Sequence, residues 1–181
     1  MSLEERALEV LSVLIGLRLA IARNAGAMKV FHFGTVRPHP NGKGTVGAYA
    51  VHVQCPWRIV ASEEIVTGSA DLYGPANQRS TSDFDPDTAM HERDGNLQNK
   101  KLGELLHGYD ADTRSIVNST ESLVVTQVQT DPYGGVRIKL SPNYCLELIP
   151  CGSSDGEEWR FLKPGDSNAQ FAVGAGRVLA I

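Results

Sequence analysis

The chain has 181 residues, of which 41% are hydrophobic and 21% charged, a composition typical of a globular protein with one sizeable core. Its net charge of −4, with no basic run longer than Lys100–Lys101, argues against a general nucleic-acid binder, which needs a basic stripe. No apolar run approaches the roughly 20 residues that span a bilayer, and three cysteines at unrelated spacings predict no disulfide framework. We therefore expect a soluble cytoplasmic protein without a nucleic-acid or membrane partner.

The first half of the chain predicts a helix followed by antiparallel strands. Ser2 and Glu5 have the spacing of a capping box, and the apolar residues after them recur with helical periodicity as far as Gly16. The apolar positions then alternate, and a loop rich in Pro and Gly covers 35–47. Strands are expected at 17–21, 28–33, 49–54, 57–60 and 65–73.

The second half repeats this order of elements. Asn96 is placed to cap a helix that Gly108 ends. Alternating segments separated by turn residues follow the helix. Strands are expected at 123–129, 136–140, 144–148, 159–161 and 171–179.

Matching segments in the two halves predict an internal duplication. Tyr49–Pro56 followed by Trp57-Arg-Ile parallels Tyr144–Pro150 followed by Trp159-Arg-Phe, with the second hairpin strand alignable at two adjacent offsets. About 80 residues bury too little apolar surface to be comfortably stable alone, so two copies are expected to cover each other. We predict an α+β fold in a single domain, 1–181, with pseudo-two-fold units of a helix and four to five antiparallel strands at about 2–73 and 96–179.

Few residues stand out as candidates for chemistry. Arg58 and Arg160 each follow a Trp and are either solvated neighbours of core tryptophans or anion-binding forks on a partner surface. His32 and Cys55 have no nucleophile or base beside them in sequence. The aspartates of 83–87 alternate as in a calcium loop, but Pro and Thr break the pattern, so neither a metal nor a cofactor is expected.

The segments in which the two units differ are the expected places for a partner to bind, because loops carry most binding residues. These segments are 35–47, 74–95 and 152–158. Together with the two Trp-Arg pairs they supply the candidate interaction residues Arg58, Arg160, His39, Lys43, Asp85 and Asp87.

Several short motifs resemble a bacterial protein family with no assigned activity. They are Val53-Gln-Cys-Pro-Trp-Arg, Asp71-Leu-Tyr, Gly134-Gly-Val-Arg, Leu146-Glu-Leu and Glu158-Trp-Arg-Phe, within a resemblance that covers about Leu17 to Val173. Some members of this family are similar to immunity-type accessory proteins encoded near bacterial toxins. The resemblance implies a protein-binding role and assigns no catalytic residue. The insertion after Gly34 and the cysteines at 145 and 151 depart from the family pattern.

Two functional hypotheses follow. The first is a non-enzymatic module that binds another protein, of the immunity type. The second is a small-molecule or metal-dependent enzyme with a site between the two units, drawing on His32, Cys55, Arg58 or the acidic residues of 83–94. Homodimerisation through an exposed strand edge is compatible with both.

Overall fold

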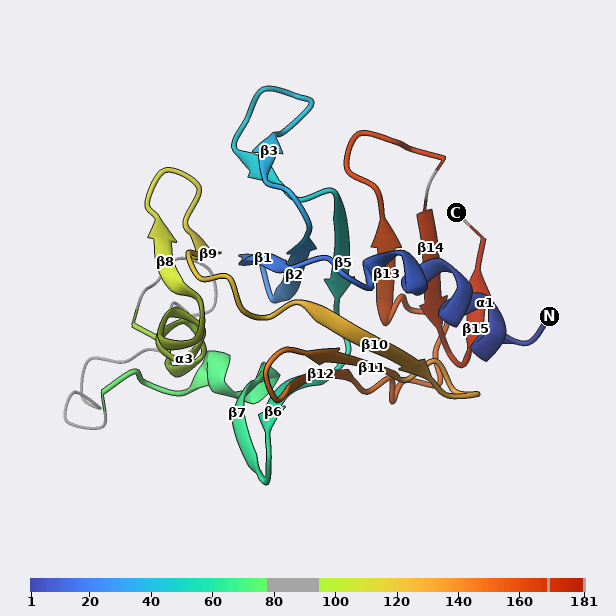
Figure 1. The fold of residues 1–181 in the computed structure, drawn as a ribbon. Coiled ribbons are helices and arrows are strands. Elements are labelled where there is room, and N and C mark those ends of the chain that lie inside the picture. The colour runs from blue at the N-terminus through green and yellow to red at the C-terminus, as the bar shows by residue number, and fades with distance from the viewer. Residues whose placement is uncertain (78–94, 169, 181) are drawn as a thin grey trace.

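The computed structural model describes residues 1–77, 95–168 and 170–180, and antiparallel sheet dominates them (Figure 1). The described helices are short: α1 (Leu3–Leu11) has 9 residues and α3 (Leu97–Leu106) has 10, and 3-10 turns form η1 (Ser12–Leu14) and η2 (Ser69–Tyr73). The hydrogen-bonded strands confirm the expected antiparallel sheet. The described helices are few and short.

The strands belong to two large sheets and one small hairpin. The eight-stranded sheet contains, in spatial order, β15 (Arg177–Leu179), β14 (Gln170–Gly174), β13 (Trp159–Leu162), β5 (Tyr49–Val53), β2 (Met28–Phe33), β1 (Leu19–Ala25), β9 (Ser115–Asn118) and β8 (His107–Asp110). The five-stranded sheet contains β10 (Val125–Thr130), β11 (Val136–Leu140), β12 (Tyr144–Leu148), β6 (Trp57–Ala61) and β7 (Glu64–Gly68). The hairpin is β3 (Arg37–Pro38) with β4 (Thr45–Val46).

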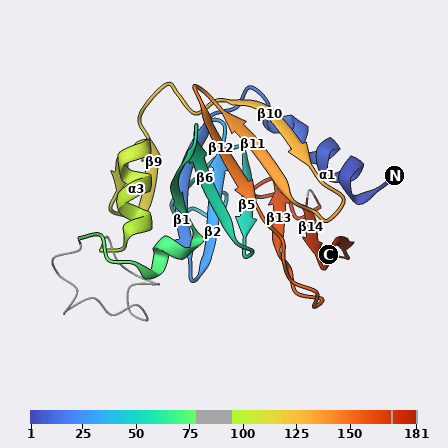
Figure 2. The same cartoon turned by 90° about the horizontal axis from the view of Figure 1, so that it is seen from below.

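The two large sheets lie face to face, and Figure 2 shows the strands of the five-stranded sheet crossing over those of the larger one. Between them is a hydrophobic core to which both sheets and both helices contribute side chains, as expected when each sheet buries one face. Phe31 meets Trp57 edge-on at 5.0 Å between ring centroids, and the buried Trp159 donates its indole N–H to the Gly134 carbonyl at 2.7 Å. Both tryptophans are therefore core residues.

The chain passes between the sheets in the same way twice. The meander β1-β2-β5 lies in the larger sheet, and the chain then crosses to β6 and β7 in the smaller one. The meander β10-β11-β12 lies in the smaller sheet, and the chain then crosses to β13 and β14 in the larger one. The two crossing segments run side by side: Cys55 N–H donates to the Glu158 carbonyl at 2.9 Å, and Ile149 N–H donates to the Pro56 carbonyl at 2.8 Å.

One helix packs at an edge of the smaller sheet, and the other packs where an edge of the smaller sheet meets an edge of the larger one. α1 begins with the expected capping box between Ser2 and Glu5 and packs against β10. α3 begins at the expected cap, Asn96, and packs against β7, η2, β8 and β9. Neither helix is long and apolar enough to cross a membrane, within the residues described.

Several elements differ from the sequence expectation. The hairpin β8–β9 was not expected, and the loop 35–47 contains the hairpin β3–β4. The strand expected over 171–179 is two strands, because Ala175 and Gly176 both have positive φ and reverse the chain. The second helix ends at Leu106 rather than at Gly108, because His107 takes the left-handed conformation, with φ 64°.

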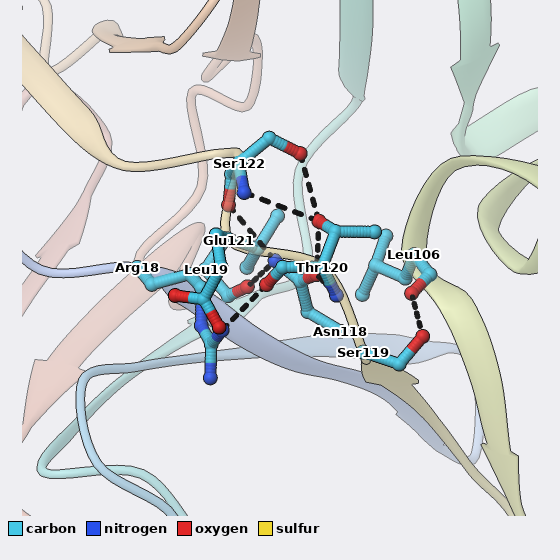
Figure 3. Close-up of polar contacts among 8 residues, drawn as sticks. All are labelled: Arg18, Leu19, Leu106, Asn118, Ser119, Thr120, Glu121 and Ser122. Carbon is cyan, nitrogen blue, oxygen red and sulfur yellow. Dashed lines mark hydrogen bonds and ion pairs between the residues drawn. The ribbon is translucent and has the colours of Figure 1, made fainter.

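A polar turn after β9 leads the chain from the larger sheet to the smaller (Figure 3). The buried Asn118 amide donates to the carbonyls of Leu19 and Ser122, at 2.8 and 3.1 Å, and accepts from the backbone and hydroxyl of Thr120, at 2.9 and 2.7 Å. Arg18, which precedes β1, donates to the Thr120 carbonyl. These side chains satisfy the backbone of the turn, so the cluster is structural.

Candidate functional site

The outward-facing side chains of the two sheets are the natural candidates for a site. On β6, Trp57 and Ile59 point into the core, so Arg58 points outward from the smaller sheet. On β13, Trp159 and Phe161 are buried, so Arg160 points outward from the larger sheet. The two candidate arginines consequently lie on opposite outer faces of the sandwich.

On the smaller sheet, a carboxylate links two arginines across three strands. Glu147 on β12 lies opposite Arg137 on β11 and opposite Arg58 on β6. Arg58 Nε is 2.5 Å from Glu147 Oε2, and Arg137 Nη2 is 3.0 Å from Glu147 Oε1. The carboxylate side chain is only 10% exposed, whereas Arg58 is 44% and Arg137 58% exposed. We call these three residues the arginine ladder.

The arginine ladder lines an open hollow of about 460 Å³. Tyr133, which is 76% exposed, and Ile149, which is 41% exposed, also line it. Asp131 is a further carboxylate of the hollow, and its Oδ1 accepts from the backbone N–H groups of Tyr133 and Gly135, each at 2.8 Å. The hollow therefore combines cationic, aromatic and aliphatic surface.

On the larger sheet, the outward arginine is held by its own neighbours. Arg160 donates to Glu157 through Nε and Nη2, at 3.0 and 2.5 Å, and to Gln170 through Nη1, at 2.6 Å. His52 lies opposite Arg160, and burial lowers its pKa, while the Glu157 charge opposes that shift. All three nitrogens of Arg160 are engaged within the chain, whereas within the described ranges Arg58 makes its hydrogen bond through Nε.

His32 is also on the outer side of the larger sheet, where it is buried. Its Nε2 lies 2.7 Å from Arg23 Nη2, and Arg23 Nη1 donates to the Thr45 carbonyl at 3.0 Å. Burial, helped by the Arg23 charge, lowers the pKa of His32 to about 3. A base this weak is poorly matched to proton abstraction near neutral pH.

The hairpin β3–β4 carries the candidates His39 and Lys43. Its Arg37 donates to the Pro164 carbonyl at 3.0 Å, which ties the hairpin to the loop after β13. His39 Nδ1 accepts from the backbone N–H of Asn41, so this side chain organises its own turn, and Lys43 is exposed. Figure 1 shows the hairpin beside the larger sheet, away from the strands of the smaller one. Asp85 and Asp87 lie outside the described residues.

The residues named for an enzyme site between the units do not come together. His32 faces outward from the larger sheet, Arg58 faces outward from the smaller one, and Cys55 is buried in the core between them. Burial raises the pKa of the Cys55 thiol to about 12, so it does not supply a thiolate near neutral pH. Among the residues with described positions, no three His, Cys, Asp or Glu side chains are grouped to hold a metal ion. The acidic segment 83–94 is outside the described residues.

The sequence pointed to Arg58 but not to its partners as site residues. Glu147 and Arg137 are far from Arg58 along the chain, and only the register of β11, β12 and β6 brings the three together. The available signal was a charged residue at the outward position of an otherwise apolar strand, as at Glu147 in Leu146-Glu-Leu. No family model, curated protein or solved structure matches the chain.

Proposed function

We propose that this protein is a non-enzymatic binding module that docks another protein on the outer face of its five-stranded sheet. The observation that carries the proposal is the hollow over β11, β12 and β6, where the arginine ladder lies beside the exposed Tyr133 and Ile149. Arginine and tyrosine are enriched among the residues that dominate protein–protein binding, because each combines a large contact area with directed hydrogen bonds.

The contrast between the two outer faces supports this choice. On the larger sheet Arg160 is bound by Glu157 and Gln170. On the smaller sheet the ladder leaves both arginines about half exposed. A partner therefore reaches the exposed half of each ladder arginine while Glu147 still holds both of them.

Some members of the bacterial family that the sequence motifs resemble are similar to immunity-type accessory proteins, which favours a toxin as the partner. Immunity proteins act by covering a protein surface and need no catalytic group of their own, which agrees with the dispersal of His32, Cys55 and Arg58. The three cysteines are free thiols, which fits the reducing cytoplasm that we propose as the compartment.

We also propose that the scaffold arose by duplication of the units at about 2–73 and 96–179. The matching connectivity of the two meanders supports this. So does their register: Trp57 pairs with Leu148, and Trp159 pairs with Val53, which are the positions that the repeat relates. Under this relation the cross-strand pair of Arg58 and Glu147 corresponds to the pair of Arg160 and His52. The outward-facing residue beside the arginine therefore differs between the two copies.

Site-specific photo-crosslinking in the native host tests the docking face. A photoreactive amino acid replaces Tyr133 in one variant and Tyr109, which is 51% exposed on β8 at the far edge of the larger sheet, in the control. We expect an adduct of defined mass from position 133 that position 109 does not give. An adduct of twice the chain mass identifies a second copy as the partner. Equal adducts from both positions, or none from 133, overturn the proposal.

A further inference from the structure

Beyond forming a surface, the arginine ladder has the construction of a specific subsite. We infer that it binds an oxyanion carried by a peptide segment of the partner, either a carboxylate or a phosphoryl group. This inference rests on the proposed docking function and names the chemistry that the docking face recognises.

The first step is the fixed position of the two guanidinium groups. Each oxygen of Glu147 is engaged by a different arginine: Oε2 accepts a hydrogen bond from Arg58 Nε, and Oε1 forms an ion pair with Arg137 Nη2 at 3.0 Å. The carboxylate is buried in the middle of the sheet, between its two cross-strand neighbours, so it holds both cations before any ligand arrives. Side chains that are already ordered lose less conformational entropy on binding.

The second step is the count of unused hydrogen-bonding groups. A guanidinium has five N–H donors, and Glu147 engages Arg58 through Nε, which, among the residues that the structure describes, leaves both terminal amino groups of Arg58 for another acceptor. Of the two carboxylates of the hollow, Glu147 is engaged through both oxygens by the arginines, and Asp131 is engaged through Oδ1 by two backbone N–H groups. What the arginine ladder still offers is donors, so the natural ligand of the ladder is an acceptor.

The third step is charge. Two arginines and one glutamate leave the ladder with one positive charge, which Asp131 of the hollow offsets. Lys139, on the same side of β11 as Arg137, leaves this face with one net positive charge. Guanidinium forks match carboxylate and phosphate oxygens in pairs of parallel hydrogen bonds, which are stronger than neutral ones. The neighbouring Tyr133 and Ile149 then offer apolar contact to the rest of the segment.

Three peptides that differ at one residue separate the sources of the oxyanion. Each has the sequence Leu-Xaa-Leu between blocked ends, with glutamate, phosphoserine or glutamine at the centre, and each is titrated into the full chain. The readout is the NMR signals of the arginine Nε–H groups. We expect the glutamate or the phosphoserine peptide to shift the signals of Arg58 and Arg137, with at least about tenfold weaker binding of the glutamine peptide. The stronger of the two anionic peptides identifies the source.

Matched variants test the assignment to the ladder. Arg58→Gln and the more exposed Arg137→Gln are each expected to weaken anionic-peptide binding about tenfold, whereas Lys43→Gln on the β3–β4 hairpin leaves it unchanged. Equal binding of the glutamine peptide, or unchanged affinity in both arginine variants, overturns the inference. If the crosslink at position 133 forms while the peptides do not bind, the docking face stands and the oxyanion subsite falls. If the peptides bind while the crosslink fails, the oxyanion subsite stands and the docking face falls.

Discussion

Arg58 Nε donates to Glu147 Oε2 at 2.5 Å, although the two residues are 89 positions apart in the chain. They belong to β6 and β12, which come from different halves of the sequence and pair directly at the centre of the smaller sheet. The contact therefore links the two halves of the chain and also fixes the position of Arg58 on the candidate docking face. A change at this pair is expected to affect both stability and binding.

Glu147→Gln tests the stabilising part of this contact. The substitution keeps the shape of the side chain but removes the negative charge that offsets the repulsion between Arg58 and Arg137. We therefore expect the free energy of unfolding to fall by about 1–2 kcal/mol. Arg137→Gln serves as the control and is expected to cost less than about 1 kcal/mol, because Arg137 is 58% exposed and solvent screens its charge. Urea denaturation followed by tryptophan fluorescence measures both. A larger loss for Arg137→Gln than for Glu147→Gln contradicts the geometry.

Local signals in the sequence predicted the parts of the fold that depend on a few neighbouring residues. The capping box at Ser2 and the cap at Asn96 are both present, because each needs only the next three residues. The hairpin β8–β9 was missed because its apolar residues Ile116 and Val117 are adjacent instead of alternating. Its turn also has no Gly, Pro or Asn, and Arg114 supplies the positive φ instead.

The pairing of Arg58 with Glu147 and Arg137 could not be predicted from the sequence, for a different reason. Alternation placed Arg58 on the outward face of its strand, but partners in a sheet depend on strand order and register, which no local pattern contains. The loop asymmetry pointed to the hairpin with His39 and Lys43, and the structure places that hairpin at the larger sheet.

Lys29 gives the fold a pH-dependent stability. It is buried, its Nζ donates to Asn24 Oδ1 at 2.7 Å and lies 5.8 Å from the centre of the Trp57 ring. Burial lowers the pKa of this ammonium from 10.5 to about 7. Between these two values the unfolded chain keeps a proton that the folded chain has released, so the contribution of Lys29 to the free energy of unfolding rises with pH in this window and is lowest below pH 7.

Lys29→Met removes this titration. We expect the variant to be more stable than the parent at pH 7, with the difference shrinking by about 1 kcal/mol for each pH unit up to pH 10. Urea denaturation of both proteins at pH 7, 8, 9 and 10 measures the difference, and other titrating groups cancel in the comparison. A difference that stays constant over this range would falsify the assignment to Lys29.

The three thiols are expected to react at very different rates. Cys151 is exposed, whereas Cys55 and Cys145 are buried. Burial raises the pKa of the Cys55 thiol to about 12 and raises that of Cys145 as well. Treatment of the native protein with a chromogenic disulfide at pH 8 should therefore label one thiol quickly and the other two only as the chain unfolds. Cys151→Ser should abolish the fast phase, and a fast phase that persists in this variant contradicts the burial of the other two.

Asn118 is expected to be the most sensitive polar residue of the turn in Figure 3. Asn118→Ala leaves the buried Leu19 carbonyl without its side-chain donor, and the N–H of Thr120 without its acceptor. Because unpaired buried polar groups cost about 1–3 kcal/mol, we expect a loss of about 2–3 kcal/mol in the free energy of unfolding. Ser119→Ala in the same turn is the control, since its hydroxyl makes a single hydrogen bond within the described part of the chain, of 3.5 Å to the Leu106 carbonyl. This substitution should change stability by less than about 0.5 kcal/mol. Equal losses in the two variants would mean that the turn does not depend on the Asn118 amide.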